Sequence, residues 1–179
     1  MVPEATLKRT DAGLVPEGKG WFVLNARDAR WGHSEELGSY VTFESESVRF
    51  ADLGININVL HPGQPNCMYH AEGAQEDFLV LAGECLAIIE DQERPLRAWD
   101  FVHCPAEARH VFVATGDTPC VLLAVGARAK GRSLVYPASE VARKHGAGVE
   151  QETAKPEEAY ARFAELERSG YRDGDLPEL

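Results

Sequence analysis

The stretch YHAEGAQEDFLVLAGE, residues 69–84, decides the interpretation of the rest of the chain. Its apolar run FLVLA predicts a buried strand, and three polar residues, His70, Glu72 and Glu76, precede that run. In an extended strand, His70 and Glu72 point to the same face because side chains alternate with a period of two. Glu76 opens the next strand, so all three side chains can reach one pocket if the two segments are neighbours in a sheet.

A second imidazole completes this polar group. His110 begins the apolar run HVFVA, which follows Pro105 and a short loop. Two imidazoles and two carboxylates between β layers would leave buried charge without partners, at a cost of several kcal/mol per ion. A divalent cation removes that cost, so the pattern favours a metal site; the alternative is a hydrogen-bonded pocket without metal.

The surrounding sequence has the rhythm of an all-β domain. Between residues 20 and 127, short runs of aliphatic and aromatic residues alternate with clusters of Gly, Pro, Asp and Asn. The expected strands are WFVLN, SYVTF, SVRF, NINVL, CMYHAE, EDFLVLA, CLAIIE, DFVHC, RHVFVA and CVLLAVGA. We expect Gly83 and the segments DQERP and TGDTP to close hairpins, and so many hairpins imply a sandwich or a barrel.

The two ends of the chain differ from this middle region. Residues 1–19 are expected to form an irregular or strand-like N-terminal arm. Residues 128–179 are expected to form a helical extension packed on the barrel, because SEVARKHG and PEEAYARFAELERSG have helical composition and each ends in a glycine. In the second of these segments, Tyr160, Phe163 and Leu166 would form the apolar face of one helix.

Composition excludes several classes of function. The 179 residues suit one domain, and a net charge of −11 argues against nucleic acid or anionic lipid as a partner. No apolar run approaches the roughly 18 residues that span a membrane. The N-terminus has no apolar stretch of the secretory kind, so we expect a cytoplasmic protein. The cysteines are expected to be reduced and buried; they are Cys67, Cys85, Cys104 and Cys120.

The spacing of the polar group resembles that of the cupins, a family of small jelly-roll barrels. Their first motif, G-x5-H-x-H-x3,4-E-x6-G, is similar to the pattern His70-x-Glu72-x3-Glu76-x6-Gly83. Their second motif, G-x5-P-x-G-x2-H-x3-N, has counterparts in Pro105 and His110. The departures are Glu72 in place of a histidine, Gln64 in place of the leading glycine with Gly63 beside it, and Trp99, Glu107 and Ala114 at other motif positions.

The resemblance implies an all-β double-stranded β-helix, or jelly-roll, barrel over residues 20–127, with motifs at 63–83 and 99–114 and short helices after it. It implies that one divalent metal ion is held by His70, Glu76 and His110, with Glu72 as the fourth ligand. Because the set offers imidazole and carboxylate but no thiolate, Mn²⁺, Fe²⁺, Ni²⁺ and Zn²⁺ are all admissible. A homodimer is also expected from the resemblance.

Further residues are candidates for the walls of the pocket. Histidines near the motifs and aromatic residues on the predicted strands could accept a small organic molecule, although in a β domain of this size aromatics at such spacings serve the core first. The candidates are His61, Tyr69, Phe78, Trp99, Phe101, His103 and Phe112.

Two functions remain in view. The resemblance implies a metal-dependent enzyme, of oxygenase or isomerase type, acting on a small organic molecule. The alternative is a non-catalytic cupin that binds or senses a small metabolite. Nothing in the sequence supports a third, purely structural or storage role, and a shared fold does not decide among activities.

Overall fold

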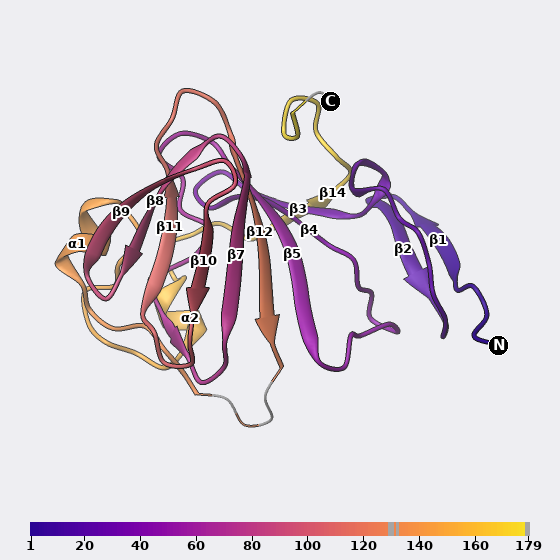
Figure 1. The fold of residues 1–179 in the computed structure, drawn as a ribbon, viewed down its shortest axis with the longest axis horizontal. Helices are drawn as coiled ribbons and strands as arrows, with labels where there is room; N and C mark the ends of the chain where they lie inside the picture. Colours follow the sequence, from indigo (N-terminus) through magenta and orange to yellow (C-terminus); the bar gives the residue numbers. More distant parts are fainter. Residues whose placement is uncertain (129–130, 132, 178–179) are drawn as a thin grey trace.

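The computed structural model describes residues 1–128, 131 and 133–177 and is built mainly from β-strands (Figure 1). Each strand is short, because Gly, Pro, Asp and Asn interrupt the apolar runs. In chain order, the elements are β1 (Thr6–Thr10), β2 (Gly13–Glu17), the 3₁₀ helix η1 (Ala26–Asp28), β3 (Trp31–Ser34), β4 (Gly38–Thr42), β5 (Leu53–Leu60), β6 (Ala71–Glu72), β7 (Glu76–Ala82), β8 (Glu84–Ile89), β9 (Gln92–Arg97), β10 (Phe101–Cys104), β11 (His110–Ala114), β12 (Cys120–Ala127), β13 (Leu134–Val135), α1 (Glu140–Lys144), α2 (Pro156–Ala159) and β14 (Glu167–Ser169).

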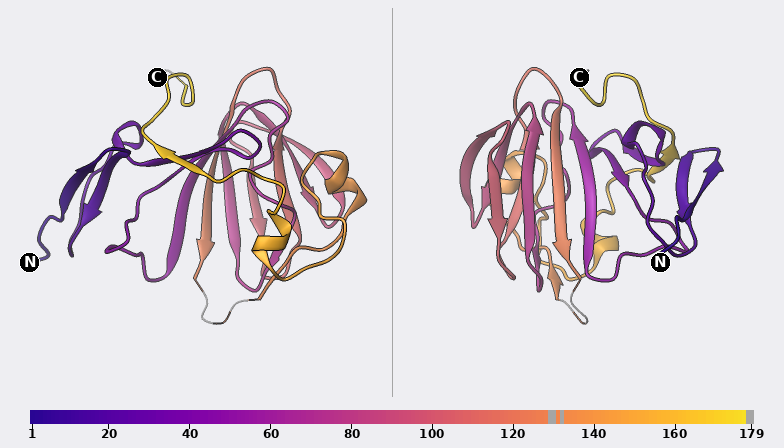
Figure 2. Two further views of the ribbon diagram at one scale, coloured as in Figure 1. Left: turned by 180° about the vertical axis from the view of Figure 1, so that it is seen from behind. Right: turned by 45° about the vertical axis from the view of Figure 1, so that its right-hand side comes forward.

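Two antiparallel sheets face each other. The larger has the strand order β10-β7-β12-β5-β4-β3-β14 and the smaller the order β11-β8-β9, with two-stranded pairs β1-β2 and β13-β6 beside them. The chain passes from one sheet to the other between β7 and β8, between β9 and β10, between β10 and β11, and between β11 and β12. This winding is that of a double-stranded β-helix, and the prediction of a jelly roll is confirmed (Figure 2).

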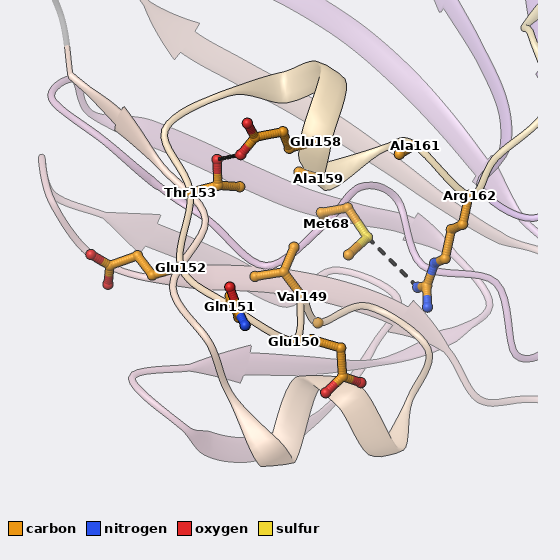
Figure 3. A pocket seen from close by; sticks show the side chains of 11 residues that line it. Met68, Val149, Glu150, Gln151, Glu152, Thr153, Glu158, Ala159, Ala161 and Arg162 are labelled. Atoms are coloured by element: carbon orange, nitrogen blue, oxygen red, sulfur yellow. Dashed lines mark hydrogen bonds between the residues drawn. The ribbon is translucent and has the colours of Figure 1, made fainter.

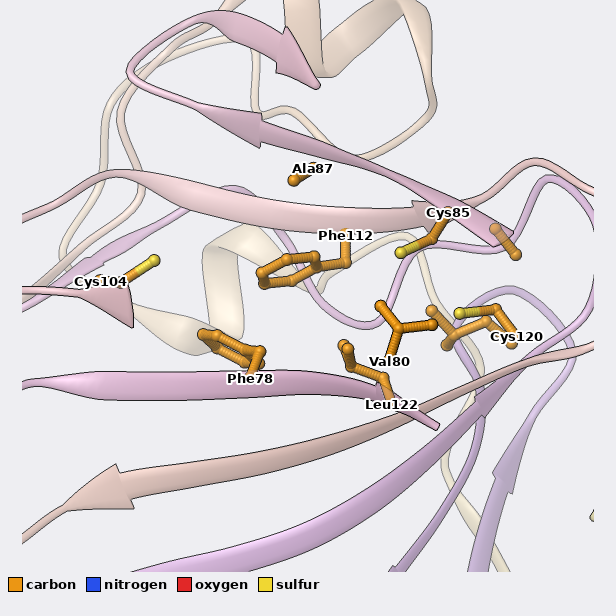
Figure 4. Close-up of a cluster of buried hydrophobic side chains, with 10 residues drawn as sticks. Phe78, Val80, Cys85, Ala87, Cys104, Phe112, Cys120 and Leu122 are labelled. Carbon is orange, nitrogen blue, oxygen red and sulfur yellow. The ribbon is translucent and has the colours of Figure 1, made fainter. Parts of the chain in front are cut away.

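The main core fills the space between the two sheets. Its side chains come from alternate positions of strands in both sheets, as the period of two requires. Three of the four cysteines are buried in it as free thiols, as expected. Figure 4 shows the cluster, which comprises Leu60, Phe78, Val80, Cys85, Ala87, Cys104, Phe112, Ala114, Cys120 and Leu122.

The outer faces of both sheets are also covered. Ile88, Val111 and Val113 of the smaller sheet pack against Tyr69 and against α1 through Ala142. On the larger sheet, an outward cluster of Trp31, Val41, Val59 and Val121 meets Ala29 and two residues near the C-terminus. The β strands therefore bury side chains on both faces, which is why several read as continuous apolar runs.

Two of the three predicted hairpin turns are sheet crossovers. Gly83 has a φ of +72°, but the strands on either side of it, β7 and β8, lie in different sheets. The segment TGDTP likewise joins β11 to β12 across the two sheets. The third prediction is confirmed: Glu90 and Asp91, both with positive φ, close the β8–β9 hairpin, in which Ile89 pairs with Gln92. Sequence patterns identified these turns but could not reveal which strands they join.

Some predicted strands are wrong. WFVLN and SVRF are irregular apart from an isolated bridge at Trp21, and CMYHAE is regular only at its end, in β6. In contrast, WGHS forms β3 although it contains no apolar run that would predict a strand. Its Trp31 and His33 are buried by neighbours distant in sequence. The predicted strand-like arm at residues 1–19 forms the β1–β2 hairpin, which lies at the opposite end of the molecule from β8 and β9 (Figure 1).

The C-terminal region is less helical than predicted. Helix α1 forms as expected, with Ser139 accepting a hydrogen bond from the Ala142 N–H and Gly146 in the left-handed region after the helix. The second helix is wrong beyond Ala159: α2 has four residues and is followed by turns and by β14, which pairs with β3. Tyr160 and Phe163 pack with Met68 rather than along one helix face. The remaining C-terminal residues, 129, 130, 132, 178 and 179, lie outside the described part.

None of the described helices is long and apolar enough to span a membrane.

Gly83 is the glycine on which the crossover depends most directly. A Cβ there would collide with the carbonyl oxygen of Pro119 and lie 2.9 Å from Cα of Cys120, in addition to the strain of a positive φ. We predict that Gly83→Ala lowers the free energy of unfolding by at least about 2 kcal/mol, measured by urea denaturation. Gly63 is a matched control with a φ of +87° and open space around it, so Gly63→Ala should cost only about 1 kcal/mol. Equal costs would contradict this account.

Candidate metal centre

Backbone pairing brings two histidines side by side. His70 and His110 form an antiparallel bridge, in which the His70 N–H donates to the His110 carbonyl over 3.2 Å and the His110 N–H donates to the His70 carbonyl over 2.9 Å. Residues directly opposite each other in such a pair point to the same face. Both imidazoles therefore point between the sheets, and their ring centroids are 4.7 Å apart.

Hydrogen bonds fix which nitrogen of each ring is free. Nδ1 of His70 lies 2.9 Å from the carbonyl oxygen of Met68, and Nδ1 of His110 lies 2.9 Å from the carbonyl oxygen of Ala108. Since a carbonyl oxygen only accepts, each Nδ1 carries the hydrogen and donates it. The lone pair of each neutral imidazole is then on Nε2 and points at the site, an arrangement typical of histidine metal ligands.

Glu76 supplies the carboxylate. It is the first residue of β7, in the sheet opposite β11, and its Oε2 lies 3.1 Å from Nε2 of His110 and 3.6 Å from Nε2 of His70. The ligand atoms of the three residues all lie within 4.8 Å of one another. Donor atoms that share one tetrahedral or octahedral cation at bond lengths of about 2.0–2.2 Å are roughly 3–3.5 Å apart, so the group has suitable dimensions.

Two atoms of this group are buried without a hydrogen bond to any described residue: Oε2 of Glu76 and Nε2 of His110. Their 3.1 Å separation satisfies the distance of an ion pair but not the alignment of a hydrogen bond. Buried polar atoms normally have partners, and an unsatisfied one costs about 1–3 kcal/mol. A cation bound to both atoms would satisfy them, so the residues present fit a divalent metal.

Without a metal, the three groups shift one another's ionisation. Burial alone would raise the pKa of Glu76, but His110 and His70 outweigh it and lower that pKa to about 2. Burial alone would lower the pKa of His110, but the Cys104 thiol and Glu76 raise it to about 9. The pKa of His70 is also raised, against the effect of burial, by Cys67 and Glu76. A metal must therefore displace protons that these imidazoles hold firmly.

Glu72, the predicted fourth ligand, lies near this group but outside it. It shares a face with His70 through the alternation of the strand, and it lines the same cavity as Glu76. Its carboxylate is not among the ligand atoms that lie within 4.8 Å of one another. Its part in metal binding stays a prediction.

The cavity beside Glu76 has a volume of about 510 Å³. It lies over the inner face of β5, β12 and β7, where three residues, Gly54, Ala124 and Gly126, are too small to fill the space. Its lining is mostly polar and comprises Arg49, Gly54, Asn56, Glu72, Glu76, Ala124, Gly126 and Arg128.

The predicted aromatic wall is divided between the core and the outside of the barrel. Phe78 and Phe112 lie within the main core, and the Phe78 ring centroid is 5.3 Å from that of His110, so these rings pack against the core side of the group formed by His70, Glu76 and His110. Tyr69 is fully buried on the outer face of the smaller sheet, where its hydroxyl accepts a hydrogen bond from the Asp91 N–H. It adjoins His70 in sequence and so points the opposite way.

The remaining pocket candidates lie outside the site. Cys104 of β10 points into the core. Because side chains alternate along a strand, His103 and Phe101 are on the opposite face of β10 and face solvent, where His103 pairs with Asp77. Trp99 is 75% exposed, and His61 lies at the surface, with Nε2 3.5 Å from Asp175. The structure brings none of these four side chains to the group of His70, Glu76 and His110.

A second cavity, of about 410 Å³, is remote from the histidines. It lies between α2 and residues 148–153, where Thr153 donates a hydrogen bond to Glu158 and Arg162 approaches Met68 (Figure 3). Arg162 is already used, because it also donates to the carbonyl oxygen of Gly146. None of its lining residues is a histidine or a cysteine, so the cavity is best described as the seam where the C-terminal segment packs on the barrel.

Sequence reasoning missed the polar residues of the main cavity, chiefly Arg49, Asn56 and Arg128. One signal was available: Asn56 and Asn58 alternate with Ile55 and Ile57 in β5, which marks one face of that strand as polar. Arg49 precedes β5 and Arg128 follows β12, and neither segment contains a motif that would have singled out its arginine.

One protein-family model matches the central part of the barrel sequence. Residues 57–126 match the family model described as the cupin domain, a range that contains His70, Glu76 and His110. No curated protein sequence matches the chain.

Solved structures show the same fold. A sugar phosphate isomerase of the cupin superfamily from Silicibacter pomeroyi matches with 24% identity and a TM-score of 0.50, over 64% of this chain and 69% of that one. The polyketide cyclase RemF from Streptomyces resistomycificus matches with 14% identity and a TM-score of 0.51, over 59% and 78%. A candidate sugar phosphate isomerase from Acidithiobacillus ferrooxidans is 26% identical with a TM-score of 0.48; the match covers 54% of this chain and 64% of that protein.

The shifted pKa values predict how stability of the metal-free protein depends on pH. The lowered pKa of Glu76 adds stability above pH 4.5 that is lost as the pH falls toward 2, and the raised pKa of His110 adds stability below pH 6.5 that is lost as the pH rises toward 9. We predict that the free energy of unfolding of EDTA-treated protein declines between pH 6.5 and 9, by on the order of 1–3 kcal/mol.

Urea denaturation at a series of pH values measures this decline. In Glu76→Gln the decline should be smaller, because the Glu76 carboxylate no longer helps to raise the pKa of His110. A free energy that stays constant or rises across this interval in the parent protein would contradict the described pairing.

Proposed function

Residues 57–126 match the cupin domain, and on that premise we propose that the chain is a metal-dependent cupin enzyme, of oxygenase or isomerase type, acting on a small organic molecule. The observation that carries the proposal is the convergence of Nε2 of His70, Nε2 of His110 and the Glu76 carboxylate next to a cavity of about 510 Å³. A divalent cation among these residues would polarise a bound oxygen atom of a substrate as a Lewis acid or serve as a redox centre.

The protein's own residues have definable tasks in this proposal. The carbonyl oxygens of Met68 and Ala108 hold the two imidazoles in the tautomer that leaves Nε2 free. Phe78 packs against His110 and excludes water from the side of the group that faces the core. Three protein donors leave further positions for a fourth ligand, for which we propose Glu72, and for substrate.

Elemental analysis of protein purified without added metal tests the site. We predict near-stoichiometric Mn, Fe, Ni or Zn in the parent and at least a tenfold loss in His110→Ala, because the variant removes one imidazole of the group. His103→Ala is the matched control, since His103 is exposed and outside the group, and its metal content should equal that of the parent.

Metal-free parent protein that takes up no divalent ion on titration would overturn the proposal. Turnover then separates enzyme from sensor. O₂ consumption with Fe²⁺ supports an oxygenase, and interconversion of sugars with Mn²⁺ or Zn²⁺ supports an isomerase. A ligand that stabilises the metal-loaded protein but is never transformed contradicts the enzyme.

Glu72 and Glu76 should differ in their effect on metal affinity. Glu76→Gln is expected to weaken metal binding at least tenfold more than Glu72→Gln, because Glu76 is the one described carboxylate with an oxygen within 3.6 Å of both imidazole nitrogens. Titration against a chelator of known affinity measures both. An equal or larger loss in Glu72→Gln would show that the metal binds closer to Glu72 than the geometry indicates.

A further inference from the structure

We propose that the cavity beside Glu76 binds a small molecule bearing a carboxylate or phosphate group, and that Arg49 and Arg128 hold this anionic group while the rest of the molecule points toward the metal. The inference deepens the proposed function, on which it rests for the metal, by specifying the class of substrate. Its basis is the distribution of charge and space around the cavity.

The inner wall of the cavity is made of small residues in register. Gly54 pairs with Gly126 and Asn56 pairs with Ala124 across β5 and β12, and Gly126 also pairs with Glu76 across β12 and β7. A Cβ at Gly126 would lie 3.2 Å from Oε1 of Glu76, and a Cβ at Gly54 would lie 3.6 Å from Nε of Arg128. The Glu76 carboxylate and the Arg128 guanidinium thus lie over neighbouring glycines of one face, with the cavity between and above them.

Arg128 is held in one orientation. Its guanidinium pairs with Glu44, which is 6% exposed and also accepts a hydrogen bond from the Phe50 N–H. A guanidinium has five N–H donors in a planar fork, and one carboxylate oxygen does not use them all. Because Arg128 lines the cavity, its remaining donors are available to a ligand there. Binding there would cost little side-chain entropy.

Arg49 supplies a second positive charge. It lines the same cavity and forms no ion pair with any described residue. Arg128, in contrast, is paired with Glu44. Asn56 adds an amide on the wall of the same cavity.

The cavity therefore combines groups of both charges. The Glu76 carboxylate lies over Gly126 and belongs to the group with the two histidines, the Arg128 guanidinium lies over the neighbouring Gly54, and Glu72 and Arg49 complete the charged lining. In a chain of net charge −11, an arginine that forms no ion pair with any described residue and that lines a polar cavity favours a ligand that brings its own negative charge. Guanidinium groups bind carboxylate and phosphate oxygens particularly well, through paired hydrogen bonds.

Isothermal titration of the protein as purified, with malate, 3-phosphoglycerate and glycerol as probes, tests the inference. At least one of the two anionic probes should bind more tightly than glycerol, and the comparison between them shows whether a carboxylate or a phosphate is preferred. Arg49→Gln should weaken that binding about tenfold, as expected for the loss of one charge-assisted hydrogen bond. Arg9→Gln, which removes another exposed arginine from the β1–β2 hairpin, should leave binding unchanged.

Arg128→Gln should weaken binding to at least the same extent. Because that variant also strips the partner from buried Glu44, Arg128→Lys is measured beside it: the lysine keeps the positive charge but loses the planar fork, and should restore folding without restoring full affinity. The Arg49 variant leaves no buried acid unpaired, so it tests the inference even if Arg128→Gln does not fold.

The outcomes separate this inference from the proposed function. Equal binding of the anionic probes by the parent and Arg49→Gln, or no preference over glycerol, would overturn the inference whatever the metal content. Metal-free protein that still binds an anionic probe in an Arg49-dependent manner would support the anion site and reject the metalloenzyme. Unchanged metal content in the arginine variants shows that any loss of binding arises at the arginines.

Discussion

The site depends on the backbone pairing of His70 with His110. That bridge places two residues 40 positions apart directly opposite each other, so both imidazoles point into the space between the sheets. The carbonyl groups of Met68 and Ala108, each two residues before its histidine, then fix the ring tautomers. Glu76 meets the pair from the facing sheet because it is the first residue of β7. Without the bridge, neither the ligand geometry nor the burial of the charged group would follow.

Strands β5, β7 and β12 contribute side chains both to the hydrophobic core and to the cavity. Along the inner face of β12, the residues change from Cys120 and Leu122 to Ala124 and Gly126, and along β7 they change from Val80 and Phe78 to Glu76. Large apolar side chains fill one half of the space between the sheets, and small or polar ones leave the other half open. The packed half stabilises the barrel and supports His110 through Phe78, while the open half holds the polar groups. Stability and chemistry are thus separated along each strand rather than between strands.

Much of this arrangement could be predicted from the sequence, for identifiable reasons. The spacing of His70, Glu72, Glu76 and Gly83 indicated the jelly-roll fold and singled out His70 and Glu76, which the structure brings together with His110, because a period of two fixes which side chains share a face. The same rule would have separated Tyr69 from His70, and it explains why Phe101 lies outside. Gly83 was recognised as a turn, but whether a turn closes a hairpin or crosses between sheets depends on contacts between distant strands.

Other features depend on tertiary contacts alone. The helix predicted after Pro156 stops at Ala159 because the following residues pack Tyr160 and Phe163 against Met68 and then pair with β3. Arg128 is oriented by Glu44, 84 residues away, and no local pattern connects them. Spacing therefore pointed to the group of His70, Glu76 and His110 that the structure brings together, whereas Arg49 and Arg128 became recognisable as cavity residues only in the folded chain.

The most direct test of this account is anomalous diffraction from crystals of the protein as purified, recorded at the absorption edges of Mn, Fe, Ni and Zn. The account predicts one anomalous peak at about 2.0–2.3 Å from Nε2 of His70, Nε2 of His110 and a carboxylate oxygen of Glu76. An anomalous peak at other residues would contradict the account. So would an ordered water molecule hydrogen-bonded to both imidazoles in crystals soaked with each metal.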